Sequence, residues 1–310
     1  MVVQPIHTEG QFQMAQVVTD KFTDRNASDI ARKLVNLLRR RFKRFGNQGQ
    51  ALSIFPIVGR GDDSLDSSYR LASPYDNFKD YHHGLNARQD EDGLLYVRTR
   101  PNRFERKGII LPDLIGREKP GSPQAIYGKE ELTRLTAEVL VRLALILDHR
   151  PGLILPGERP SIIKPDSAGS LLLSRLQGVR QSEDSDNSDL QTSLKVLDKT
   201  SRRLEFAIIV SDFLSIGWEE WLTKISRQIE VIAFQITDPW DIELPEFGQR
   251  FNHQDQIIRI NTRNPKVRQA YRNLTAKQQD HIKTVLEQNQ IRHYRLATTN
   301  PLFKQLERSL

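Results

Sequence analysis

The apolar run at residues 207–210 (AIIV) constrains the fold of this chain more than any other segment. An uninterrupted run with β-branched residues is typical of a strand buried on both faces, as in a parallel sheet. Ser211 and Asp212 follow the run directly, and a second run, residues 231–236, ends just before Asp238. Because open α/β sheets bind ligands at the carboxyl ends of their strands, we expect a polar, ligand-facing edge there.

From about residue 108 onward, strand patterns alternate with helical patterns, as in βαβ units. We expect strands at 108–111, 152–155, 206–210, 231–236 and 293–297, and helices at 130–147, 190–197, 218–229, 265–290 and 301–310. The predicted fold class is therefore α/β, with a Rossmann-like, mostly parallel sheet and helices on both faces, over residues 108–310.

Two segments precede this domain. Residues 1–49 are expected to form an N-terminal extension that contains a basic amphipathic helix starting near Ser28. Residues 50–107 are expected to form a small β-containing segment, with strand candidates at 51–58 and 94–99. The predicted domain boundaries are therefore 1–49, 50–107 and 108–310.

Composition narrows the class of protein. The chain has 310 residues, a formal net charge of +7 and no cysteine, which excludes disulfides, thiolate zinc sites and cysteine nucleophiles. No apolar run is long enough to span a bilayer, and the polar first ten residues do not resemble a signal peptide. We therefore expect a soluble, cytoplasmic protein.

A basic run at residues 39–44 carries five cations around one phenylalanine: Arg39, Arg40, Arg41, Lys43 and Arg44. Such a run can bind nucleic acid, anionic lipid or an acidic partner. Cations also suit the C-terminal end of a helix, so a solvated helix end explains the run equally simply. Nucleic-acid binding is accordingly the second functional hypothesis, and membrane contact through this cluster alone would be weak and reversible.

Residues 75–88 (YDNFKDYHHGLNAR) resemble the signature of the family called domain of unknown function 58. The matching or conservatively replaced positions are Asp76, Asn77, Lys79, Ala87 and Arg88. The segments at 96–98 and 104–106, the strand ending at Ser211 and Asp212, and the turn at 237–239 also resemble the family in order and spacing. The resemblance covers about residues 70–305.

Members of this bacterial family have a von Willebrand factor A-like fold and are encoded beside MoxR-type AAA+ ATPases. The resemblance therefore implies a non-enzymatic, chaperone-like adaptor or assembly factor. It would act with such an ATPase in remodelling or maturing a client protein through protein–protein interaction. Many relatives carry transmembrane helices ahead of the signature, and their absence here agrees with the soluble member expected above.

The resemblance also implies a metal-ion-dependent adhesion site. In working von Willebrand A domains, Mg²⁺ is held by an Asp-x-Ser-x-Ser motif after the first strand, a later threonine, and an aspartate after the fourth strand. The first motif corresponds to residues 113–117, where Asp113 is kept and Arg117 replaces the second serine. The threonine falls near Ser188, and Asp212 corresponds to the last ligand.

This replacement predicts a degenerate metal site. Mg²⁺ requires several oxygen ligands in near-octahedral array, whereas Arg117 places a permanent cation where a ligand belongs. We expect Arg117 to pair with Asp113 or Asp212 in place of the ion, and expect neither metal nor cofactor, while a weak Mg²⁺ site at Asp113 and Asp212 stays open. The edge with Asp113, Arg117, Ser188 and Asp212 is the expected partner contact.

The sequence contains no complete catalytic constellation, so we expect no enzyme. Residues 59–63 are glycine-rich but lack the Lys-Ser/Thr of a phosphate loop. Lys129 follows Gly128, yet Pro123 stands where a phosphate loop has its first glycine, which leaves Lys129 as a lysine at a helix start. Ser211 lacks the G-x-S-x-G turn that presents a nucleophilic serine.

Overall fold

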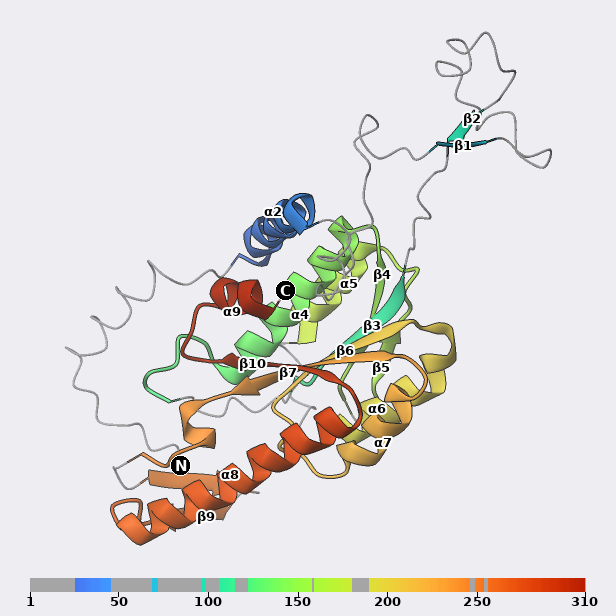
Figure 1. The fold of residues 1–310 in the computed structure, drawn as a ribbon. Coiled ribbons are helices and arrows are strands. Elements are labelled where there is room, and N and C mark those ends of the chain that lie inside the picture. Colours follow the sequence, from blue (N-terminus) through green and yellow to red (C-terminus); the bar gives the residue numbers. More distant parts are fainter. Residues whose placement is uncertain are drawn as a thin grey trace.

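The computed structural model describes residues 26–45, 69–71, 96–98, 106–114, 122–157, 159–179, 190–245, 249–253 and 256–309 (Figure 1). Its centre is a six-stranded sheet with the strand order β10-β7-β6-β3-β4-β5. The strands are β3 (Lys107–Pro112), β4 (Arg150–Leu155), β5 (Ser161–Ile163), β6 (Phe206–Ser211), β7 (Glu230–Thr237) and β10 (Arg292–Ala297).

The sheet is parallel except at one edge, where β5 pairs antiparallel with β4. Numbered by their order in the chain, the strands lie in the sequence 3-2-1-4-5-6, the order of doubly wound, Rossmann-like sheets. The order reverses between β3 and β6. The expected α/β fold with a mostly parallel sheet is therefore confirmed.

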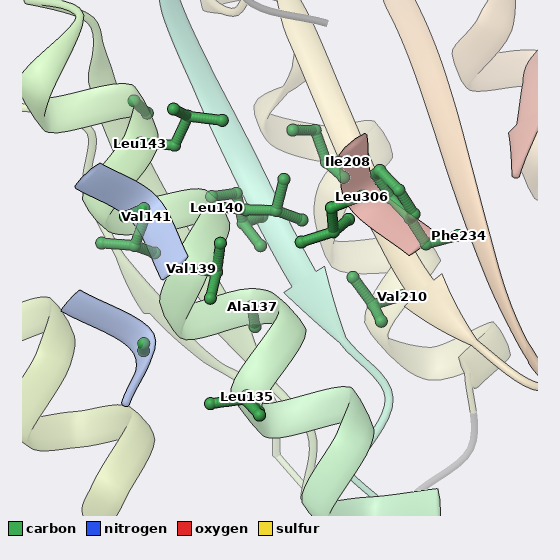
Figure 2. Close-up of a cluster of buried hydrophobic side chains, with 14 of the residues drawn as sticks. Leu135, Ala137, Val139, Leu140, Val141, Leu143, Ile208, Val210, Phe234 and Leu306 are labelled. Atoms are coloured by element: carbon green, nitrogen blue, oxygen red, sulfur yellow. The ribbon is translucent and has the colours of Figure 1, made fainter. Parts of the chain in front are cut away.

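Helices cover both faces of the sheet because successive strand residues point to opposite sides. Ile208 and Val210 of β6 belong to a core cluster on one face, and Ala207 and Ile209 belong to a cluster on the other. The first face carries α4 (Lys129–Ile146), α5 (Gly169–Gly178) and α9 (Leu302–Ser309), and the second carries α6 (Leu190–Thr200), α7 (Trp218–Ser226) and α8 (Pro265–Gln288). Figure 2 shows the first cluster, in which Leu140 of α4 and Leu306 of α9 meet the sheet residues.

The helix α2 (Ala27–Phe45) packs against α4 and α9 on the outer side of the first helix layer. Its residues Ile30, Leu34 and Leu38 are buried at helical spacing, as the sequence indicated, and they belong to the same core cluster as the sheet. The helix therefore shares a core with residues 108–310, although the division of the chain into domains stays a prediction.

Four short elements or pairs were not expected. Strand β5 has three residues and α5 begins without a side-chain cap, so both give weak signals. Two antiparallel hairpins also occur, β1 (Tyr69–Leu71) with β2 (Tyr96–Arg98), and β8 (Gln249–His253) with β9 (Gln256–Ile260). Of these, only β2 falls within a predicted strand, residues 94–99, while the candidate strand at 51–58 lies outside the described residues.

One close approach inside the sheet requires a glycine. Gly108 on β3 is the register partner of Phe206 on β6, and a Cβ atom built on Gly108 would lie 2.3 Å from Cζ of that ring. The Arg106 guanidinium carbon lies 5.4 Å from the ring centroid. Because Phe206 is buried, its ring has little freedom to move aside.

We expect Leu34→Ala to lower the free energy of unfolding by about 2–5 kcal/mol, because a fully buried leucine leaves a cavity between α2, α4 and α9. Urea unfolding followed by circular dichroism measures this. The matched control is Asn36→Ala on the exposed side of the same helix, with an expected change within about 0.5 kcal/mol. Equal stability of the two variants would contradict the integration of α2 into the core.

We expect Gly108→Ala to destabilise the protein by about 1–3 kcal/mol through overpacking against Phe206. Thermal melts compare it with Gly178→Ala, where no atom lies within 4 Å of the new Cβ. Adding Phe206→Leu to Gly108→Ala should recover part of the loss, since the two substitutions share one contact. Simple additivity of the two costs would contradict the proposed steric cause.

Candidate functional site

Polar side chains gather where four neighbouring strands of the sheet end. Asp113 follows β3, Asp212 follows β6, Asp238 follows β7 and Thr298 follows β10. Carboxyl ends of parallel strands share one edge, so these residues lie along the same side of the sheet. Asp113 and Asp212 flank the point between β3 and β6 where the strand order reverses, which is the usual ligand position in such sheets.

Asp113 and Ser211 form the innermost part of this edge. The Ser211 hydroxyl donates to Oδ2 of Asp113 at 2.6 Å and accepts from the backbone N–H of Phe213 at 3.0 Å. The backbone N–H of Asp113 in turn donates to the carbonyl of Val210 at 2.8 Å. Because Ser211 is fully buried, these bonds fix the ends of β3 and β6 against each other.

The ammonium of Lys129, the first residue of α4, lies between two carboxylates of the edge. It donates to Oδ2 of Asp212 at 3.1 Å and to Oδ1 of Asp241 at 2.6 Å. The exposed fractions of the three side chains are 18% for Lys129, 10% for Asp212 and 15% for Asp241. This charge network therefore joins α4, the end of β6 and the loop after β7 in a mostly desolvated place.

The pKa values of this network reflect a balance between burial and charge. Burial lowers the pKa of Lys129, but the carboxylates of Asp212 and Asp241 outweigh it, so its pKa lies above the ordinary 10.5. Burial raises the pKa of the Asp241 carboxyl above 3.8, and the nearby Lys129 ammonium opposes that rise only in part. Lys129 is therefore a permanent cation near neutral pH.

Asp238 organises the loop that carries Asp241. It caps the short 3₁₀ helix η6 (Pro239–Asp241), accepting from the backbone N–H of Trp240 at 3.0 Å, while Oδ2 of Asp241 accepts from the backbone N–H of Asp238 at 2.8 Å. Oδ2 of Asp238 accepts from the Thr298 hydroxyl at 2.7 Å. This reciprocal cap holds the Asp241 carboxylate within hydrogen-bonding distance of the Lys129 ammonium.

Phe213 holds a backbone conformation that bulky residues seldom adopt. Its φ is +56°, in the left-handed region, directly after Asp212. The ring is buried and meets Trp218 edge-on, with 5.1 Å between ring centroids, which compensates for the backbone strain. The chain thereby turns sharply after β6, and Oδ1 of Asp212 accepts from the N–H of Leu214 at 3.0 Å. Strained backbone next to charged side chains is common at binding sites.

This chemistry favours binding over covalent catalysis. The Ser211 hydroxyl is buried and engaged on both sides, so it is not presented as a nucleophile. Lys129 is held protonated, which removes it as a general base. What the edge presents is fixed charge and hydrogen-bonding capacity.

The residues at this edge do not fit Mg²⁺. The place between Asp212 and Asp241 belongs to the Lys129 ammonium, and Asp113 accepts the Ser211 hydroxyl. Within the part of the chain that the structure describes, no group of three His, Cys, Asp or Glu side chains is arranged to hold a metal ion. The carboxylates of Asp212 and Asp241 need a cation for charge balance, and the Lys129 ammonium provides it.

The structure brings Asp113 and Asp212 to one edge, as the sequence analysis proposed. Arg117 and Ser188 lie outside the described residues, as do the signature residues Asp76, Asn77, Lys79, Ala87 and Arg88. In the basic cluster, Arg40 is exposed on α2, and the side chains of Arg39, Arg41, Lys43 and Arg44 are outside the description.

Lys129, Asp241 and Thr298 were not identified as residues of the edge from the sequence. Lys129 was interpreted as an ordinary lysine at a helix start, and Asp241 and Thr298 were assigned no role, whereas Asp238 was expected at the polar edge. One signal was available for Lys129. A cation in the first turn of a helix is unfavourable next to the positive end of the helix dipole, so it indicates a carboxylate partner. No local pattern identifies that partner.

Comparison with known proteins gives one family. The family described as "Protein of unknown function DUF58" matches residues 68–281, more than half of the chain. An uncharacterized protein of Mycobacterium avium is 43% identical over 61 residues, which are 19% of this chain and 36% of its own length. An uncharacterized protein of Mycobacterium tuberculosis is 41% identical over 61 residues, 19% of each chain. The match thus spans about a third and a fifth, respectively, of these curated relatives.

A solved structure from Vibrio fischeri, described as an uncharacterized membrane-spanning protein, is similar over 62% of this chain and 89% of its own. The identity is 10% and the TM-score 0.22. Its description contradicts the cytoplasmic location expected from the sequence, and that expectation is withdrawn. Among the described residues, no helix is both long and apolar enough to cross a bilayer. The expectation rested on the lack of a spanning segment, and attachment at a membrane surface needs no such segment.

We expect Lys129→Met to lower the free energy of unfolding by about 3–5 kcal/mol, because it leaves two largely desolvated carboxylates without their cation. Burial already raises the pKa of the Asp241 carboxyl, and this rise is no longer opposed by Lys129, so the penalty is largest at neutral pH and shrinks as pH falls toward the ordinary value of 3.8. Thermal melts over this pH range measure the effect.

The matched control is Lys224→Met, which removes a lysine paired with Asp198 at 2.6 Å on the surface of α7. The Lys224 side chain is 55% exposed, so its loss should cost at most about 1 kcal/mol. A pH-independent loss in Lys129→Met, or equal losses in the two variants, would contradict the charge-balancing role of Lys129.

Proposed function

We propose, because this chain belongs to the DUF58 family, that it is a non-enzymatic adaptor or assembly factor that works with a MoxR-type AAA+ ATPase. In this proposal the ATPase supplies the energy, and the adaptor brings it to a client protein that is remodelled or matured. The resemblance to the family implies the partner.

We further propose that residues 108–310 form a von Willebrand A-like domain with a degenerate adhesion site. Two features support this. The sheet has the order 3-2-1-4-5-6 with an antiparallel edge strand, and Asp212 follows the fourth strand in chain order, where such domains carry their last metal ligand. In working domains a bound ion meets an acidic group of the partner, whereas here the ion's place belongs to Lys129.

The position of Lys129 is the observation that carries the proposal. A salt-bridged ammonium cannot be released by chelators, so a partner that docks on this edge does so without a divalent ion. The network also keeps the loops after β6 and β7 in one arrangement, ready for binding without an ordering cost. The proposed activity is therefore constitutive docking, with regulation left to the nucleotide state of the ATPase.

The surroundings of the network also suit a protein partner. Ile216, four residues after Asp212, is 89% exposed, and Ile242, directly after Asp241, is 54% exposed. Apolar side chains beside a fixed charged group supply both the contact area and the register that protein interfaces need. Their exposure supports a proposed contact on the loops after β6 and β7.

The test is affinity capture with the tagged protein in native-host extract, with ATP, with ADP and with EDTA, read by mass spectrometry. We expect a MoxR-type ATPase whose recovery changes with the nucleotide and is unaffected by EDTA. A double variant at the edge, Ile216→Ser with Ile242→Ser, should reduce that recovery at least tenfold, or about 1.4 kcal/mol, without unfolding the chain, because both side chains are exposed.

Leu274→Ser on α8 is the matched control, since this leucine is 65% exposed and is not on either loop. Absence of any AAA+ ATPase, or equal recovery with the edge variant, would refute the adaptor function. Recovery of nucleic acid that is lost when Arg39, Arg40 and Arg41 are neutralised would instead support the second hypothesis from the sequence.

A further inference from the structure

The helix α2 carries an unusual excess of positive charge. Its 19 residues include seven cations (Arg32, Lys33, Arg39, Arg40, Arg41, Lys43, Arg44) and one acid (Asp29). Only those near its C-terminal end suit the helix dipole, and Arg32 and Lys33 lie in its first half. Capping therefore does not account for the whole of this charge.

The packing of α2 decides which side of the helix is available. Ile30 and Leu34 are fully buried against the rest of the core, whereas Arg32 and Arg40 are exposed. The apolar side chains of Ile30, Leu34 and Leu38 are therefore used inside the protein and are not available to insert into a bilayer. A ligand of α2 therefore contacts the cationic side of the helix and binds by electrostatic attraction.

The last helix of the chain extends this cationic side. α9 lies next to α2, with the Lys33 ammonium 5.6 Å from the centroid of the Phe303 ring (Figure 1). Lys304 and Arg308 of α9 are exposed. The acids nearby are Asp29 at the start of α2 and the half-buried Glu307. Two adjacent helices thus form one positively charged layer, which we call the α2/α9 face.

The shape of this face distinguishes between polyanions. The major groove of DNA is about 12 Å wide and admits one helix of similar diameter. Since α2 lies against both α4 and α9, the α2/α9 face is wider than such a groove. A broad cationic layer matches an extended anionic surface.

We propose that the α2/α9 face binds anionic phospholipid headgroups at a membrane surface. Each cation close to such a surface contributes modestly, so several together give reversible attachment that salt weakens. This site is separate from the edge of the sheet. Because α2 and α9 both lie on the side of the first helix layer, which covers one broad face of the sheet, attachment through them directs the carboxyl-end edge sideways, where a protein partner retains access to Lys129 and Asp212.

The test is co-sedimentation of the full chain with vesicles of phosphatidylcholine alone and of phosphatidylcholine mixed with phosphatidylglycerol. We expect binding to the anionic vesicles only, and its loss in high salt. The variant with Arg32→Gln, Arg40→Gln and Lys304→Gln should lower the partition coefficient about a hundredfold, in line with the contribution of three surface cations.

The matched control removes the same charge from the opposite face of the sheet, at α6 and the 3₁₀ helix η5 (Ser201–Arg203), by Lys199→Gln, Arg202→Gln and Arg203→Gln. It should bind vesicles like the unmodified chain, and thermal melts confirm that both variants fold. Equal losses of vesicle binding in the two variants would mean that net charge alone causes the effect, and would overturn the proposal. Failure to bind anionic vesicles, together with binding of labelled duplex DNA lost in the α2/α9 variant, would assign the face to nucleic acid instead.

Discussion

The carboxyl-end edge of this protein depends on one largely desolvated cation, the Lys129 ammonium. Asp212 and Asp241 approach each other from consecutive strand ends, and two desolvated carboxylates repel unless a positive charge lies between them. The Lys129 ammonium provides that charge from a third element, the start of α4. Two local features keep these carboxylates within reach of the lysine. The strained turn at Phe213 follows Asp212, and the reciprocal cap between Asp238 and Asp241 fixes Asp241.

A lysine and a divalent ion solve the same electrostatic problem differently. An ion is exchangeable, and its ligands can open to accept a partner's oxygen. An ammonium is covalently attached, has three donors, and uses two of them here. The edge therefore behaves as a fixed surface, which agrees with the recognition function proposed above.

The sequence predicts the layers of this fold better than its site. Strands such as β6 and β7 are readable because full burial on both faces requires an unbroken apolar run. β5 and α5 were not predicted, because a strand of three residues and a helix without a side-chain cap leave little pattern in the sequence. The Lys129 network escapes for another reason: its partners lie 83 and 112 residues away, so only the strand order of the sheet brings them together. A long separation in the sequence also hides the hydrogen bond between Asp238 and Thr298, which are 60 residues apart.

The contact between α2 and α9 has a consequence for synthesis on the ribosome. These helices come from opposite ends of the described chain, and more than two hundred residues separate them. Ile30 and Leu34 emerge from the ribosome long before α9, one of the two helices that α2 packs against. The nascent chain therefore exposes an amphipathic helix until α9 has also been translated. A molecular chaperone that recognises apolar helix faces would find its substrate in this interval.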